Sequence, residues 1–456
     1  MKKILVISFI FLSFSVMAQE KTVLTLEECK TIALENNTAL KNASLDMIAA
    51  KAQKDEIFTN FFPNVSMTGL AFHSLDYMIK MDMVDFFGDN EFGYNMQALW
   101  EESAAELGAD QTLNYLKYGQ RYGVTAIQPV YMGGRIVNGN RYAALGIKAA
   151  QLKKSITGRD LMVSVEKDYF DVLALQEKQR TLGSLENLLD SLEKVADLAF
   201  SQGVILKSDH MLVHTKRMEL DNGKRLLRSG LRLLKMNLLT NIGLQYSVLE
   251  LDNFIFPQAT LEGLPKPEDV YMDENEAAAR VEEHQLLDLQ VEAKQYQKKL
   301  TLGSTLPQVG IGFGYGYTRL SEVNPGRWNG AAFVAVQIPL SDWAKNSYAM
   351  KRQQTEIDKA VNDRNHLGDM LVLQQRKLYL ELTSAWDALQ LAISQQEYVE
   401  YLYQQAQLSY DSGYSTITDL LQAYTEVAQK QEGYCNALSD YITCLENYTG
   451  RLPSNE

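Results

Sequence analysis

The sequence predicts a mainly α-helical chain with a smaller membrane β part. Two stretches, 134–200 and 343–410, contain no proline, and each is long enough for a helix of about 100 Å at ~1.5 Å per residue. Segments with the two-residue period of β-strands come before each stretch. The same order of elements occurs twice along the chain. We therefore expect long antiparallel coiled-coil helices, four strands and an internal two-fold repeat.

The long helices carry the apolar spacing of a coiled coil. Steps of three and four residues separate the apolar positions of the first one, which are Leu182, Leu185, Leu189, Leu192, Ala196 and Ala199. This heptad pattern predicts packing against another helix. Shorter helices are expected at 26–60, 208–240, 276–303 and 418–448. Because two short helices stacked end to end match one long helix, we expect a hollow α-barrel of even height, with a solid coiled coil as the alternative.

The β pattern is clearest in the second half of the chain. Glycines at every second position from 310 to 316 alternate there with Ile311, Phe313, Tyr315 and Tyr317. A strand with one bulky apolar face and one bare face suits a membrane barrel, whose outer face meets lipid. The other strands are expected at 331–340, 65–74 and 122–130. Four strands cannot close a barrel and open edges are not tolerated in lipid, so we expect three chains and twelve strands.

Matching motifs lie at one constant offset along the chain. Pro129 and Pro339 are 210 residues apart, and each marks an expected junction between a strand and a long helix. The same offset separates the expected tip turns at Gly203 and Gly413, and also Asp209 and Asp419. One offset from proline to aspartate indicates a duplicated unit.

The amino terminus reads as a secretory signal peptide over residues 1–18, with a basic start, a short apolar run and a small residue at the exit. The apolar run is too short to span a bilayer as a helix. We expect a first repeat at 19–244, an equatorial linker at 245–275 and a second repeat at 276–456. The long link 75–121 is expected to be an extracellular loop with some helix near 98–118. It is either an ordinary insertion or a partner-binding loop.

Charge and composition exclude several functions. The segment 1–18 holds two lysines and no acid, so its removal takes the net charge from −13 to −15. Such acidity argues against a nucleic-acid partner. His210 and His214 have metal-ligand spacing on one helix face, yet no third ligand is evident and we expect no metal site. The pairs Asp55-Glu56 and Glu282-Glu283 are interpreted as solvated helix faces, so no enzyme activity and no cofactor are expected.

Taken together, the motifs resemble those of the TolC family of outer-membrane efflux and secretion channels. The resemblance rests on 24–29 (LTLEEC), 33–37 (ALENN), 128–135 (QPVYMGGR), the glycine turn and aspartate of 410–423, and the ending 445–450. It implies a homotrimer with a twelve-stranded barrel in outer-membrane lipid and a helical tunnel across the periplasm. It also implies a periplasmic adaptor protein and an inner-membrane pump of the RND or ABC type. The implied function is a passive export duct of a tripartite efflux or type I secretion system.

The resemblance also places a gate at the periplasmic tip of the helices. It assigns Asp419 to an inward-facing acidic ring and Tyr410 to the closed-state contacts, with Asp209 and Phe200 as their matches in the first half. The sequence departs from some members at Ser415 and Gln422, where arginine and a second aspartate stand. Crowded carboxylates favour bound cations, so multivalent cations are expected to block the pore through Asp419. Ser208 and Thr418 are expected as helix caps.

Two other classes of function compete with the duct. One is a trimeric coiled-coil surface fibre or adhesin without transport, and the other is a soluble periplasmic scaffold. Within the duct hypothesis, drugs, metal ions and proteins all remain open as cargo, because the same passive tunnel serves each of them.

Overall fold

The structure is a computed structural model that describes residues 22–450 apart from 77, 82–83, 85–87, 108–112, 116, 258–263, 320–324 and 341. The predicted signal peptide 1–18 lies outside the described residues. The chain forms two compact units, which we describe separately. The helical unit comprises Met1–Ile48, Ala149–Asp288 and Asn362–Glu456, and the strand unit comprises Ala49–Lys148 and Leu289–Val361. The helices α5 (Arg135–Ser201) and α9 (Asp342–Asp411) contribute to both.

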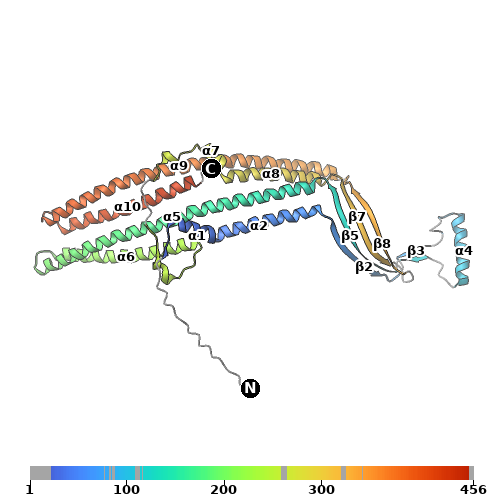
Figure 1. Cartoon of the computed structure of the whole chain (residues 1–456), viewed down its shortest axis with the longest axis horizontal. Coiled ribbons are helices and arrows are strands. Elements are labelled where there is room, and N and C mark those ends of the chain that lie inside the picture. Colours follow the sequence, from blue (N-terminus) through green and yellow to red (C-terminus); the bar gives the residue numbers. More distant parts are fainter. Residues whose placement is uncertain are drawn as a thin grey trace, which may run out of the picture. The chain divides into compact units, whose positions relative to one another are not determined.

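The strand unit is built on a four-stranded antiparallel sheet with the order β2-β5-β7-β8 (Figure 1). Its strands are β2 (Asn64–His73), β5 (Tyr118–Met132), β7 (Gln308–Arg319) and β8 (Arg327–Gln337). All four expected strands are present. The prediction was wrong about the bounds of β8, which begins four residues earlier than 331 and ends three residues before 340.

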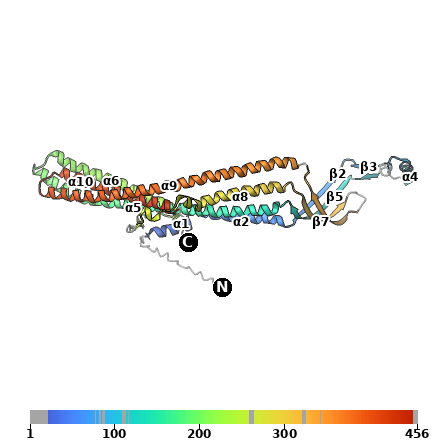
Figure 2. The same cartoon turned by 90° about the horizontal axis from the view of Figure 1, so that it is seen from above.

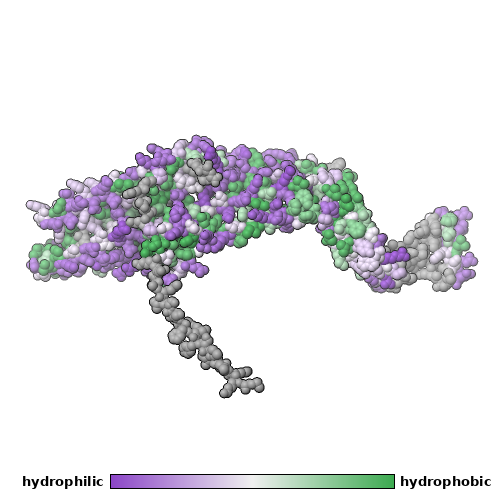
Figure 3. Space-filling view, viewed as in Figure 1, coloured by the Kyte–Doolittle hydropathy of each residue, from purple (hydrophilic) through white to green (hydrophobic). Residues whose placement is uncertain are grey.

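The sheet has one bulky apolar face, which Figure 3 shows as a hydrophobic area over the strands. The register places Met67, Val124 and Tyr315 in one row, and all three side chains are exposed. In another row of the same face, Tyr122, Tyr317 and Trp328 form an aromatic group. Tyr122 stacks on Tyr317 with 5.0 Å between ring centroids, and the centroid of Trp328 lies 5.8 Å from both. The apolar face expected for β7 therefore continues onto β2, β5 and β8.

The opposite face of the sheet carries mainly small and polar side chains at its middle, together with the apolar Leu70, Ile127 and Phe333. It lines a hollow of about 270 Å³ to which Thr68, Thr125, Asn329, Ala331 and three glycines (Gly123, Gly314 and Gly316) contribute. Gly123 and Gly316 are paired in the ladder, and a Cβ on either one would lie 2.8–2.9 Å from the Cα of the other. Small residues therefore let neighbouring strands approach on this face.

The link between β2 and β5 contains β3 (Ile79–Met81), α4 (Glu91–Leu107) and β4 (Leu113–Tyr115). The helix expected near 98–118 was misplaced, since it begins at Glu91 and ends at Leu107. Tyr118 pairs with His73 in the sheet, so the end of the expected helix lies in a strand instead.

Two helices lead into the sheet: α2 (Thr38–Phe58) precedes β2, and α8 (Glu282–Gly303) precedes β7. After β5 the chain turns through Gly133 and Gly134, which have φ of +62° and +76° and lead into α5. A Cβ on Gly133 would lie 2.2 Å from the carbonyl oxygen of Gly303, so only glycine fits this contact.

The helical unit contains α1 (Leu26–Asn36), α6 (Lys207–Asn241), α7 (Glu274–Arg280) and α10 (Ile417–Thr449) together with parts of the long helices. The expected single helix 26–60 is broken at Asn37, whose side-chain amide donates to the carbonyl of Asn241 at 2.7 Å. The expected helix 276–303 is broken at Val281, which has an extended backbone. Within the described part of the chain, no helix is both long and apolar enough to cross a membrane.

The linker around 245–275 is held by buried tyrosines. It forms η2 (Val248–Asn253), β6 (Phe254–Ile255) and η3 (Pro267–Val270), and β6 pairs in parallel with β1 (Thr22–Val23). The Tyr169 hydroxyl donates to the carbonyl of Pro257 at 2.9 Å, and Tyr448 accepts from the amide of Met272 at 3.1 Å. Side-chain hydroxyls thus satisfy backbone groups of this irregular segment.

One interpretation of charged residues needs correction. Glu282 and Glu283 were expected on a solvated face, but both bind Arg159 of α5, at 3.2 and 2.5 Å. The Arg159 side chain is 10% exposed, so this ion pair is partly shielded from water.

Candidate functional site

The two helical hairpins of the helical unit, α5–α6 and α9–α10, end in the same turn. Gly203 and Gly413 have φ of +74° and +75° and lie just after the long helices. In each turn an amide reaches back five residues, from Val204 to Ala199 and from Tyr414 to Ser409, at 2.8 Å. This is the Schellman arrangement, which places glycine at the left-handed position. The two predicted tip turns therefore have the same local structure.

The ends of both hairpins share one apolar cluster. Its buried members come from α5, α6 and α10 and are Leu189, Leu192, Ala196, Val213, Leu220, Leu420 and Leu421. The α9 side chains Tyr403, Ala406 and Tyr410 pack against it, and Figure 2 shows the four helices running together. The predicted seam residues Leu189, Leu192 and Ala196 of α5 thus take part in the packing that joins the two hairpins.

Asp419 completes the capping box of α10, whose N-cap residue is Thr416. The Thr416 amide and hydroxyl both donate to Oδ2 of Asp419, at 2.9 and 2.7 Å, and the Asp419 amide donates to the Thr416 hydroxyl at 3.3 Å. This capping box closes the first turn of the helix. Hydrogen bonds from the Thr416 side chain and backbone lower the pKa of Asp419, which is fully exposed. The expected cap Thr418 was wrong, because the helix begins one residue earlier, at Ile417.

Asp209 occupies the matching position of α6 without a capping box. The N-cap residue is Leu206, which has no side-chain acceptor, so the expected cap at Ser208 was also wrong. Ser208 instead donates to Asp209 at 3.3 Å. Asp209 lies in the first turn, where the helix dipole favours a negative charge.

The structure places the two aromatic candidates in different surroundings. Tyr410 is half-buried against the apolar cluster, and burial, followed by the neighbouring Asp411, raises its pKa. Phe200 is 40% exposed and stacks on the His210 ring with 4.7 Å between centroids. Ser415 is half-buried in the turn, whereas Gln422 is exposed one helical turn after Asp419.

A histidine cluster next to the first turn was missed by the sequence argument. The expectation that His210 and His214 have no third ligand was wrong, since Asp197 of α5 lies 2.6 Å from Nε2 of His210 and 3.7 Å from Nε2 of His214. Glu193 lies 2.8 Å from Nδ1 of His214. Asp197 and His210 flank the turn at Gly203, so counting outward from the turn along both helices would have paired them.

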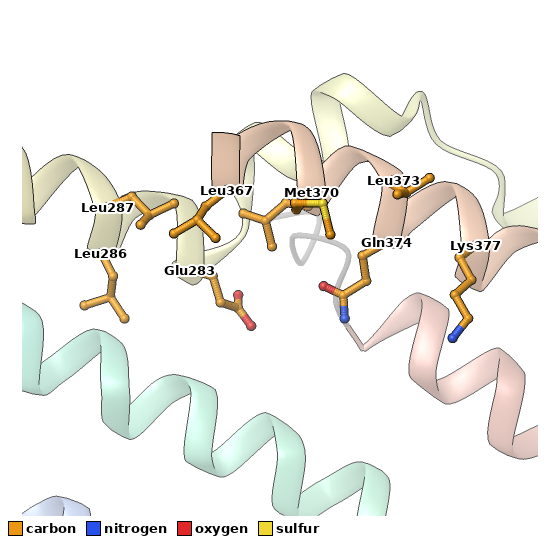
Figure 4. A pocket seen from close by; sticks show the side chains of 9 residues that line it. Glu283, Leu286, Leu287, Leu367, Met370, Leu373, Gln374 and Lys377 are labelled. Atoms are coloured by element: carbon orange, nitrogen blue, oxygen red, sulfur yellow. The ribbon is translucent and has the colours of Figure 1, made fainter. Parts of the chain in front are cut away.

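An apolar groove lies between α8 and α9 in the helical unit, with a volume of about 590 Å³ (Figure 4). Leu286 and Leu287 of α8 line one side, and Leu367, Met370 and Leu373 of α9 line the other. The three α9 side chains are 43–53% exposed. Apolar side chains gathered at this exposure are typical of a contact surface.

The two prolines differ in their local structure. Pro129 lies inside β5 at a bulge, where the pairing with β7 shifts so that Val130 has no partner opposite it. Proline has no amide to donate, so it is found in strands at such irregular positions. Pro339 lies between the end of β8 at Gln337 and the start of α9 at Asp342.

Comparison with known proteins identifies the fold. Residues 275–447 match the sequence family described as outer membrane efflux protein. The outer membrane channel CmeC of Campylobacter jejuni has a TM-score of 0.74 at 13% identity over 94% of this chain and 87% of that chain. VceC of Vibrio cholerae has 0.70 at 13% identity, over 93% and 95%. The open-state MtrE channel of Neisseria gonorrhoeae has 0.66 at 14%, over 93% and 88%. No curated protein sequence matches the chain significantly.

The chain therefore has the fold of TolC-like outer-membrane channels, in agreement with the resemblance seen in the sequence. Residues 275–447 carry the match to the outer membrane efflux protein family. This is a family of channels rather than enzymes. The predicted location, the cell outer membrane with an extension into the periplasm, agrees with the family description and with these neighbours, which are outer membrane channels, and the surface-fibre alternative is not favoured.

Proposed function

We propose that this chain is one protomer of a homotrimeric passive duct, in which three sheets form a twelve-stranded barrel and the helices form a periplasmic tunnel. The sheet edges carry the proposal. Within the described residues, β2 and β8 each have a strand partner on one side only. Unpaired backbone edges are not tolerated in lipid, so the edges need a further partner.

The strand directions fit closure by copies of the same chain. Directions alternate from β2 to β8, so β8 of one copy can pair in antiparallel fashion with β2 of the next. Three copies then give an even number of strands, as membrane barrels have. The two hairpins β2–β5 and β7–β8, each followed by a long and a short helix, act as two matching units, which makes the trimer pseudo-sixfold.

The faces of the sheet support a membrane location for the barrel. The face with Met67, Val124 and Tyr315 is the lipid-facing side, and the aromatic group of Tyr122, Tyr317 and Trp328 lies at the interface with water. The small polar face with Thr68 lines the lumen.

The hairpin tips are the proposed periplasmic gate. Asp419 contributes one acidic ring, Tyr410 packs behind it, and Phe200 and Asp209 hold the matching places in the first unit. The turns at Gly203 and Gly413 present these residues, and Pro129 and Pro339 mark the ends of the barrel. A periplasmic adaptor and an RND or ABC pump supply the opening and the energy, because the sequence has no phosphate-binding loop.

Neighbouring residues of β2 allow the duct to be tested. Met67→Arg puts a charge on the lipid face, at a cost of about 2–4 kcal/mol near the bilayer midplane, whereas Thr68→Arg puts the same charge in the lumen. We expect wild-type protein to form conducting pores in planar bilayers, Met67→Arg to lose membrane assembly, and Thr68→Arg to assemble with altered conductance. Intact trimers that never conduct would contradict the duct, and equal assembly of the two variants would contradict the assignment of the faces.

A further inference from the structure

Carboxylates of α5 pair with side chains of α6 along the first hairpin. Far from the turn the partners are lysine and arginine. Glu186 binds Lys224 and lies 3.4 Å from Arg217. Arg217 also binds Asp190. Close to the turn the partners change to His214 and His210. Within the described part of the chain, the ion pairs of Glu193 and Asp197 are all with these two histidines. Close to the turn, Glu193 and Asp197 therefore face imidazole nitrogens, which can bind metal ions. Ammonium and guanidinium groups cannot bind them.

We propose that Asp197, His210 and His214 bind a transition-metal ion of the zinc type and thereby fasten the end of α5 to the start of α6. One ligand atom from each side chain lies within 4.8 Å of the others. In a tetrahedral zinc site with metal–ligand distances of about 2.0–2.1 Å, ligand atoms are roughly 3.3 Å apart. The separations of 2.6 and 3.7 Å between the Asp197 carboxylate oxygen and the two Nε2 atoms lie on either side of that value.

The surroundings orient both rings for this role. Glu193 accepts from Nδ1 of His214, which leaves Nε2 of that ring toward Asp197. A carboxylate behind a ligating histidine is the usual second partner in metal sites, because it fixes the tautomer and makes the ligand more basic. The Phe200 ring stacks on His210 at an interplanar angle of 16° and limits its rotation.

The donor set selects the class of metal. Two imidazole nitrogens and one carboxylate suit zinc and similar transition metals, whereas calcium and magnesium prefer oxygen ligands only. Three protein ligands leave a fourth position for water. The site does not depend on the proposed duct, but in that duct a bound ion would hold one of the gate hairpins in a single conformation.

Metal titration of the full-length protein, purified without a histidine tag and stripped of metal, tests the site. We expect calorimetry to show one Zn²⁺ per chain, and Co²⁺ to give the visible absorption of a four-coordinate ion. The double variant His210→Ala/His214→Ala should lose both signals, and Glu193→Gln should keep the stoichiometry with affinity about 10–100-fold lower.

His284→Ala is the matched control, since His284 also contacts a carboxylate, Asp288, at 3.5 Å. It should bind Zn²⁺ like the wild type. Circular dichroism and a cooperative thermal unfolding transition establish that each variant is folded. Absence of wild-type binding, or binding that survives in the folded double variant, would show that the four side chains form only a hydrogen-bonded cluster. Pore conductance is measured separately, so failure of the duct leaves this result unaffected.

Discussion

Glu166 is a carboxyl group that the fold of the helical unit buries, with 3% of its side chain exposed. It contacts the Lys30 ammonium of α1 and lies beside the carboxyl of Glu446. Burial, together with the hydrogen bond that protonated Glu166 donates to Glu446, raises the pKa of Glu166 to about 8, and the attraction of Lys30 only partly opposes this. The residue is therefore a source of pH-dependent stability at physiological pH.

The sign of this dependence follows from the direction of the shift. Because the folded pKa lies above the ordinary value of about 4.3, the stabilisation is complete below pH about 4.3 and is lost as pH rises through about 8. Glu166→Gln, which stays neutral, should gain stability relative to the wild type by a few kcal/mol between pH 5 and pH 8. Thermal unfolding followed by circular dichroism measures this difference. Glu35→Gln, at an exposed site on α1, is the control, and equal pH profiles for both variants would contradict the buried proton.

Single residues of the tip were predictable where their chemistry is local. The left-handed turns follow from Gly203 and Gly413, because few other residues adopt positive φ without strain. The cap of α10 was assigned to the wrong threonine, since Thr416 and Thr418 both precede Asp419 and only the start of the helix decides between them. Asp197 was missed because it comes near His210 through the hairpin rather than through the spacing on one helix.

Whole elements were predicted to within a few residues when their pattern was long. The structure begins α5 at Arg135 and ends α9 at Asp411, within one residue of the expected bounds. The errors occur where tertiary contacts outweigh local preference. Asn37 interrupts a helical sequence by bonding to the end of α6, and strand pairing converts the end of the expected loop helix into β5.

The N-terminal turn of α10 combines two roles that one substitution would confuse. Asp419 caps the helix and is also the proposed acidic ring, so Asp419→Ala removes both a cap and a charge. Thr416→Ala removes the cap alone, at a cost of about 1 kcal/mol, and keeps the carboxylate. We expect multivalent cations to block conductance of the wild type and Thr416→Ala in planar bilayers, and to lose this effect in Asp419→Ala. Block that persists in Asp419→Ala would assign the cation site to other residues.

At the scale of the whole molecule, the sequence could predict the strands and helices but not the surfaces that they leave uncovered. The groove formed by Leu286, Leu287 and the α9 residues Leu367, Met370 and Leu373 has no counterpart in any sequence motif, because its two helices are distant in the chain. It becomes visible only when α8 and α9 are side by side.

The groove is the surface on which the proposed trimer can be tested in the helical unit. In the proposed trimer the sheet edges pair with further copies of the chain, and an apolar groove with half-exposed leucines is the kind of surface that such copies cover. Leu373→Lys places a charge in the groove, so we expect loss of the trimer in favour of monomers in analytical ultracentrifugation and on native gels. Asp369→Lys changes the charge at an exposed α9 position that does not line the groove, and it should leave the trimer intact. A stable trimer of Leu373→Lys would instead assign the groove to another occupant, such as the adaptor, because contacts between copies would then lie elsewhere on the helices.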